Sequence, residues 1–397
     1  MRKIILLSLA MFLQYMMLPV WFVPMIPYVQ ALPGGQNWAT ACGFIMALGT
    51  LAAPLLGMFA DRFFRAERVL ASCNILCAAL LAAASCVESP ALLFAILLLA
   101  MLFYMPTWSL MAAIGMAHLD KSGFARVRLF GTVGWMASGF CAPVATKLFG
   151  LADFDTSSGI FAAGALIAAT AAALAFALPP TESAAKDKPM SLIDALGLRA
   201  LVLFRNRSFL GFMILLFLAM IPYQWYNVYG GAFLKSNGFG YLTLTMNIGK
   251  IGALAFMLCI PWIMGHFGFL RLMLAGILVL ILRDACLLGS STGGGAALGL
   301  AGVFVNGFIY NIFIVGSQMY IGETGPRELR NQAQGLVNLL TAGAGVFASN
   351  AIFDFLLRQG SAGAANWTVA FAVALGFSTA IALALVPALR KTQGIRT

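Results

Sequence analysis

Long, uninterrupted apolar runs recur along this chain and limit the folds open to it. Residues 4–28, 92–116 and 209–228 each reach or exceed the roughly 20 residues that an α-helix needs to cross about 30 Å of hydrocarbon. A transmembrane β-barrel would show shorter segments that alternate polar and apolar residues, whereas these runs are long and almost wholly apolar, in a chain that contains 41 glycines. The sequence therefore predicts an all-α membrane protein.

The composition supports this prediction. Of the 397 residues, 62% are hydrophobic and 9% are charged, while an ordinary soluble domain is about one quarter charged. The first run follows Arg2 and Lys3, as in a secretory signal, but it is too long for the apolar core of a signal and lacks a convincing cleavage site. We interpret it as the first membrane span.

The apolar pattern places twelve spans along the chain. They are expected at residues 4–30, 39–60, 68–87, 91–117, 128–149, 157–179, 208–234, 241–265, 270–289, 296–321, 331–357 and 365–389. About nineteen basic residues then fall in alternate loops, and the other side has only Lys147, Lys235 and Arg358. Cytoplasmic loops are enriched in lysine and arginine, so we expect a multi-pass protein of the cell inner membrane with both termini in the cytoplasm. We therefore attribute the net charge of +11 to the basic cytoplasmic loops and their contact with the lipid bilayer, and we expect no nucleic-acid partner.

One polar segment divides the chain. Residues 180–207 interrupt the apolar pattern between the sixth and seventh spans, which predicts an N-terminal six-helix half at 1–179, a cytoplasmic linker at 180–207 and a C-terminal six-helix half at 208–397. Two halves joined by a central cytoplasmic loop are the layout of major facilitator transporters. Within the linker, residues 191–204 are amphipathic enough to lie along the membrane surface, and a plain connection is the alternative.

The loop after the second span carries a glycine, an acid and a cationic run. It resembles the signature loop of the major facilitator superfamily, in which these residues clamp neighbouring helices. The resemblance implies a gating role, with charge-assisted bonds that form in one conformation and break in another, for Asp61, Arg62, Arg65 and Arg68. An ordinary positive-inside loop is the alternative.

Polar side chains inside the spans are candidates for solute binding, because such groups are costly in hydrocarbon. Helical spacing places Arg128, Thr132 and Trp135 on one face of the fifth span. It also places Gln224 and Asn227 on one face of the seventh. Amide and cationic groups beside aromatic rings suit a flat polar solute, and hydrogen bonds between packed helices are the alternative.

The C-terminal spans hold further polar groups. The same spacing groups Asn247 with Lys250 in the eighth span, and Asn306 with Tyr310 and Phe313 in the tenth. In the ninth span, Arg283 and Asp284 are consecutive in a helix. We therefore expect that they do not face each other, that each meets a neighbouring helix, and that their role is structural.

Five stretches resemble the nucleoside:proton symporter family, a branch of the major facilitator superfamily. They lie at residues 103–107, 126–135, 224–227, 281–283 and 332–335. The resemblance implies that the family's nucleoside-contacting residues of spans five and seven correspond to Arg128, Thr132, Trp135, Gln224 and Asn227.

The second half departs from the family pattern. This chain has Lys250 and Ala253 where we expect the family's Gln and Glu, and Asn306, Tyr310 and Asn311 where we expect its Tyr, Phe and Asp. Two carboxylates are therefore missing and one cation is added. Lys250 is either a proton carrier or a partner for an anionic solute or a neighbouring acid.

These observations predict a secondary active transporter that takes up nucleosides, or a similar small polar solute, by alternating access with proton coupling. A carrier of a sugar-like or anionic organic solute, or an uncoupled facilitator, is the alternative, and a sensor or receptor is a further class. His118 and His266 are the only histidines, and the sequence has neither a catalytic or metal-binding motif nor a phosphate-binding loop. We therefore expect no enzyme activity, no cofactor and no metal.

Overall fold

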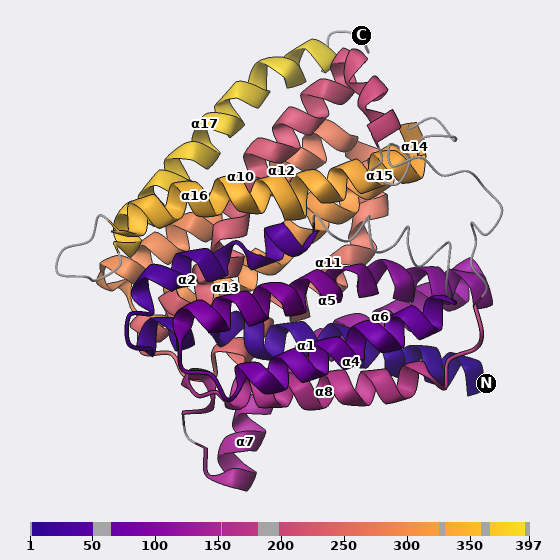
Figure 1. Ribbon diagram of the computed structural model, residues 1–397. Coiled ribbons are helices and arrows are strands. Elements are labelled where there is room, and N and C mark those ends of the chain that lie inside the picture. Colours follow the sequence, from indigo (N-terminus) through magenta and orange to yellow (C-terminus); the bar gives the residue numbers. More distant parts are fainter. Residues whose placement is uncertain are drawn as a thin grey trace. The chain divides into compact units, whose positions relative to one another are not determined.

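The computed structural model describes residues 2–50, 65–151, 153–181, 198–324, 330–358 and 366–393 (Figure 1). Every regular element within these ranges is a helix. The chain forms two compact units: unit 1 comprises Met1–Leu196 and Phe239–Asn247, and unit 2 comprises Gly197–Gly238 and Ile248–Thr397. The predicted boundaries of the two halves stay a prediction, because most of the linker, residues 182–197, lies outside the described residues.

Unit 1 is a bundle whose helices run from indigo to magenta in Figure 1. They are α1 (Arg2–Ala31), α2 (Gln36–Gly43), α4 (Ala66–Ala84), α5 (Pro90–His118), α6 (Lys121–Ala137), α7 (Cys141–Phe149) and α8 (Gly159–Ala175), with 3₁₀ segments η1 (Ser138–Phe140) and η2 (Phe154–Thr156). α1 packs against α6 and α8, and α4 packs against α5 and α8. A Cβ atom on Gly134 of α6 would lie 2.0 Å from the Phe12 carbonyl oxygen of α1, so this glycine allows the two backbones to meet.

Unit 2 contains the remaining helices. They are η3 (Leu198–Arg205), α10 (Arg207–Ser236), α11 (Leu242–Phe267), α12 (Phe269–Gly289), η4 (Ser290–Gly294), α13 (Ala296–Tyr310), η5 (Asn311–Val315), α14 (Gly316–Thr324), α15 (Arg330–Asn338), η6 (Leu339–Ala344), α16 (Gly345–Arg358) and α17 (Trp367–Gln393), with the start of α11 grouped in unit 1. α12 packs against α13 and α17, and α10 packs against α16. A buried apolar cluster that includes Leu216, Met273 and Phe313 forms the core.

The described helices agree with the predicted spans. Nine helical segments in the described ranges are long and apolar enough to cross a membrane, namely Arg2–Ala31, Ala66–Ala84, Pro90–His118, Arg126–Phe149, Arg207–Ser236, Phe269–Gly294, Ala296–Ile321, Gly335–Arg358 and Trp367–Leu385. The shorter Gly159–Ala175 covers the predicted sixth span and α11 covers the eighth. Part of the predicted second span, residues 51–60, lies outside the described residues.

Segments η5 and η6 are π-helical, and such segments change which residues share a helix face. A π-helical turn holds more residues than an α-helical turn, so side chains beyond it rotate relative to those before it. Tyr310, just before η5, is 37% exposed, whereas Phe313 within η5 is 0% exposed and packs opposite Gly276 of α12. The predicted grouping of Phe313 with Asn306 and Tyr310 is therefore wrong.

Candidate functional site

In unit 1, an arginine lies on an aromatic surface. The guanidinium carbon of Arg128 on α6 is 4.3 Å from the centroid of the Tyr15 ring on α1. The Tyr15 ring stacks on Trp108 of α5, with the centroids 5.1 Å apart and the planes 17° apart. Arg128 is partly exposed, and its N–H groups make no hydrogen bond within the described part of the chain. The cation–π contact thus orients the guanidinium while leaving its donors available.

A buried polar network lies behind this surface and joins α1, α4 and α5. Gln14 Nε2 donates to Thr107 Oγ1 at 2.7 Å, and Asn74 Nδ2 donates to Gln14 Oε1 at 3.0 Å. Tyr104 Oη donates to the Gln14 carbonyl at 2.7 Å and accepts from Trp108 Nε1 at 2.9 Å. The network therefore fixes the position of the Trp108 ring. Our sequence reasoning missed these residues, although an amide inside an apolar span is a usable signal.

Thr132 and Trp135, the other predicted residues of this face, are both partly exposed. Asn247 Nδ2 donates to the carbonyls of Trp135 and Met136 at 3.1 and 3.2 Å. These carbonyls lie where α6 gives way to the 3₁₀ segment η1, so their usual helical bonds change. Asn247 thus bonds to backbone, which favours the interhelical alternative for this residue.

In unit 2, the structure brings the predicted amide pair together. Asn227 Nδ2 donates to Gln224 Oε1 at 3.2 Å, as their i,i+3 spacing on α10 predicts. Gln224 is 8% exposed, and its Nε2 donates to the Thr341 carbonyl at 2.9 Å. Thr341 lies within η6, where the π-helical turn departs from the α-helical bonding pattern. Asn227 remains partly exposed.

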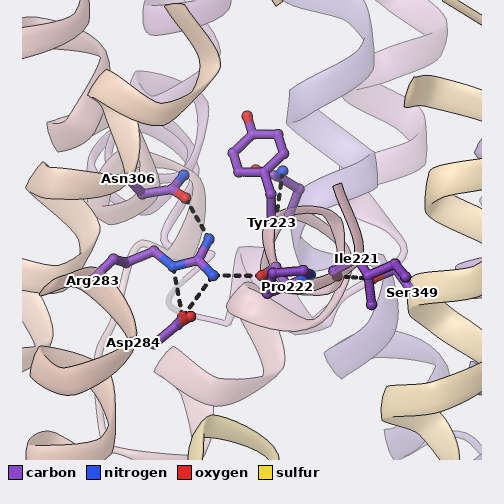
Figure 2. Close-up of polar contacts among 8 residues, drawn as sticks. Ile221, Pro222, Tyr223, Arg283, Asp284, Asn306 and Ser349 are labelled. Atoms are coloured by element: carbon purple, nitrogen blue, oxygen red, sulfur yellow. Dashed lines mark hydrogen bonds and ion pairs between the residues drawn. The ribbon is translucent and has the colours of Figure 1, made fainter. Parts of the chain in front are cut away.

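An ion pair lies inside unit 2, and both of its side chains are 0% exposed. Arg283 donates to Asp284 Oδ1 from Nε at 2.9 Å and from Nη2 at 2.6 Å (Figure 2). The prediction that these consecutive residues do not face each other is therefore wrong. The Cβ atoms do diverge, but the arginine side chain is long enough to bend back so that its guanidinium reaches its neighbour's carboxylate.

The same guanidinium reaches two further helices. Arg283 Nη1 donates to Asn306 Oδ1 of α13 at 3.0 Å, and Nη2 donates to the Pro222 carbonyl of α10 at 2.5 Å. Its carbon lies 5.3 Å from the Tyr226 ring centroid. Figure 2 shows the guanidinium of Arg283 joined by dashed lines to Asp284, Asn306 and Pro222. Arg283 thus ties Asn306, a predicted solute-binding residue, to the helix that carries Gln224 and Asn227.

The remaining predicted residues of unit 2 differ in exposure. Lys250 Nζ lies 5.3 Å from the Tyr310 ring centroid, and both side chains are at least partly exposed. Asn311 is 4% exposed, and its Nδ2 donates to the Ala253 carbonyl of α11 at 2.5 Å. The geometry of Asn311 favours a link between helices, and Lys250 places its ammonium group against the Tyr310 ring.

The predicted gating loop is described only in part. Asp61 and Arg62 lie outside the described residues, while Arg65 and Arg68 are exposed at the start of α4. Glu67, between them, is 6% exposed and accepts from the Thr181 backbone N–H at 2.9 Å. Thr181 Oγ1 is also 3.0 Å from His118 Nε2. Glu67, which our sequence reasoning missed, thus joins the start of α4 to the chain that follows α8.

Comparisons with known proteins agree with this architecture. The family model described as "Nucleoside H+ symporter" matches residues 1–393. YegT of Escherichia coli (strain K12), a protein named as a nucleoside transporter, is 31% identical over 346 residues, covering 85% of this chain and 81% of YegT. Xanthosine permease of the same organism is 26% identical over 397 residues, covering 95% of this chain and 93% of the permease.

Solved structures show the same fold. The crystal structure of the nucleoside transporter NupG matches with a TM-score of 0.82 at 24% identity, covering 98% of this chain and 99% of NupG. A peptide transporter of the POT family matches with a TM-score of 0.74 at 14% identity, covering 97% of this chain and 94% of that one. This chain therefore has the predicted major facilitator fold of a multi-pass membrane transporter and belongs to the nucleoside H+ symporter family.

Proposed function

We propose that this protein takes up nucleosides by alternating access, driven by a proton gradient. The observation that carries the proposal is the Arg128 guanidinium, which lies on the Tyr15 ring with its hydrogen-bond donors unused in the described part of the chain. A nucleobase offers a flat ring to the aromatic surface and carbonyl or ring-nitrogen acceptors to the guanidinium. Thr132 and Trp135 extend this surface along α6.

The amide pair of unit 2 supports the same proposal. Asn227 and Gln224 present donor and acceptor atoms that match ribose hydroxyls or the polar edge of a base. Asn306 and Tyr310 add an amide and a partly exposed ring, Lys250 adds a cation, and Asn311 bonds to the Ala253 carbonyl of α11. Amide and aromatic groups of this kind are typical of sites for polar ligands.

The protein is expected to act in the cell inner membrane with both termini in the cytoplasm, because basic residues are concentrated in alternate loops. Gating would use the charged loop with Asp61, Arg62, Arg65 and Arg68, through charge-assisted bonds that would form in one conformation and break in another. Transport of this kind needs no catalytic residue, cofactor or metal.

A thermal-shift screen of the purified protein tests the substrate class. A ligand that binds only the folded state raises the melting temperature. We expect purine and pyrimidine nucleosides to raise it in a concentration-dependent manner, while simple sugars and organic acids leave it unchanged. Stabilisation by organic acids or sugars, with no response to any nucleoside, would favour the alternative carrier of an anionic or sugar-like solute.

Gln224→Ala and Asn227→Ala are each expected to weaken nucleoside binding by about 1–3 kcal/mol, because each leaves a buried polar partner unpaired. That loss corresponds to roughly a 5–150-fold rise in the dissociation constant, measured by isothermal titration calorimetry. Asn237→Ala is the matched control, since this amide is exposed just beyond the end of α10. Wild-type affinity in both site variants would show that the pair does not contact the solute.

Lys250→Gln separates two roles for the lysine. Glutamine is chosen because it is the residue expected in the family and cannot titrate. We expect weaker solute binding at every pH, because the variant loses the cation that lies against Tyr310. Binding across pH 6–8 and proton-driven accumulation are measured on the same preparation. Loss of accumulation with normal binding would instead make Lys250 the proton carrier, and no change in either would leave it structural.

A further inference from the structure

The buried pair of Arg283 and Asp284 links three helices, but a link between helices does not by itself require a charged pair. Both side chains are 0% exposed and lie within α12, a helix that is apolar enough to span the membrane. Taking two charges out of water costs several kcal/mol per ion, and apolar residues of similar volume often serve stability as well or better. An ionisable pair at such a position is a candidate for function.

The second oxygen of the carboxylate is the most informative atom. Asp284 Oδ2 is buried and makes no hydrogen bond within the described part of the chain. The hydroxyl of Ser378 on α17 is itself fully buried and lies beside the carboxyl group, near enough to interact with it. Buried polar atoms are nearly always paired, so an oxygen that receives neither of the two bonds from Arg283 calls for an explanation. A proton on Oδ2 supplies one, because a protonated carboxyl oxygen can donate to the serine hydroxyl, whereas the ionised form can only accept from it.

The balance between the neutral and the ionised form of this carboxyl group depends on the positions of its neighbours. Burial favours the neutral form of a carboxyl group, and a neighbouring guanidinium favours the ionised form. The groups that face the pair from the packed helices are the phenols of Tyr223 and Tyr226 on α10, the amide of Asn306 on α13 and the hydroxyl of Ser378 on α17. Phenols ordinarily titrate at about pH 10, so they do not compete with a carboxyl group for protons near neutrality.

The guanidinium links this carboxyl group to the candidate solute site. It donates to Asn306 and to the carbonyl of Pro222, which is two residues before Gln224 (Figure 2). Proline lacks an N–H group, so α10 lacks one of its own hydrogen bonds at this point and can bend there. A shift of the guanidinium would therefore move groups on both α10 and α13.

We propose that Asp284 is the residue that loads the transported proton, and that Arg283 conveys its protonation state to the solute site. The proposal rests on the proton-coupled uptake proposed above. A proton from water binds Oδ2, and the neutral carboxyl group then holds Arg283 less strongly because a charge-assisted bond is lost. The guanidinium strengthens its bonds to Asn306 and Pro222 instead. Release of the proton on the other side of the membrane restores the ion pair.

The test measures solute and proton uptake together in proteoliposomes, with radiolabelled nucleoside and an internal pH dye. Asp284→Asn keeps the shape of the side chain but cannot titrate. We expect it to lose accumulation above the external concentration and the accompanying proton influx, while measurable nucleoside exchange remains. Asp354→Asn is the matched control, since Asp354 is also paired with an arginine, Arg358, at 2.8 Å, but at a position where that arginine is 51% exposed.

A second variant controls for misfolding. It is needed because Asp284→Asn leaves a buried guanidinium without its counter-ion. The double variant Arg283→Gln/Asp284→Asn removes both charges, and we expect the same loss of accumulation with exchange retained. Wild-type proton influx and accumulation in either variant would overturn the assignment of Asp284. Absence of nucleoside-dependent proton influx in the wild-type protein would instead overturn the proposed coupling itself, so the two failures are distinguishable.

Discussion

Arg128→Lys is expected to lose most nucleoside uptake although it keeps the positive charge. The planar guanidinium can lie flat on the Tyr15 ring and donate two parallel hydrogen bonds, and an ammonium group can do neither. Loss of a charge-assisted pair of bonds of this kind corresponds to a rise in the dissociation constant of about tenfold or more. Initial uptake rates and equilibrium binding measure the effect.

Two further variants make this prediction specific. Arg126→Lys on the same helix is the control, because Arg126 is exposed and lies outside the predicted face. Tyr15→Leu is expected to weaken binding as well, since it removes the ring that orients Arg128. If Arg128→Lys binds and transports normally while Arg128→Ala does not, then only the charge matters and the role of a planar donor is wrong.

Gly307→Ala is expected to reduce the amount of folded protein sharply. A Cβ atom at this position of α13 would lie 1.7 Å from the Gly249 carbonyl oxygen of α11, and that backbone atom cannot move aside without separating the two helices. Overpacking typically costs about 1–3 kcal/mol, and a clash with backbone belongs at or above the upper end.

The melting temperature and the yield of monodisperse protein in detergent measure this effect. Gly265→Ala is the matched control, because a Cβ atom on this exposed glycine of α11 meets no atom within 4 Å. Alanine also favours the helix over glycine, so the control variant should melt at or above the wild-type temperature. Equal melting temperatures for Gly307→Ala and the wild-type protein would show that α11 and α13 do not cross closely at Gly307.

The membrane spans could be predicted because length and hydropathy are properties of the sequence alone. The pairing of Gln224 with Asn227 could also be predicted, since an i,i+3 contact depends only on regular helix geometry. The displacement of Phe313 could not, because the π-helical segment η5 is fitted to the packing opposite Gly276, and nothing in the local sequence specifies that packing.

The contact between Arg283 and Asp284 shows a second limit. Reasoning from Cβ directions excludes contacts between consecutive helical residues, but it ignores the reach of a long side chain that has acceptors on two other helices. The network around Gln14 was overlooked for another reason. Its amides are visible in the sequence, but the partners that satisfy them lie about 60 to 90 residues away along the chain.

The most direct test of the proposed function is uptake by purified protein in sealed proteoliposomes. With an inward proton gradient and no other protein present, we expect labelled nucleoside to accumulate above its external concentration and a protonophore to abolish that accumulation. The same vesicles should acidify inside when nucleoside is added. Nucleoside that never exceeds its external concentration under any proton gradient, with no acidification, would contradict proton-coupled nucleoside uptake.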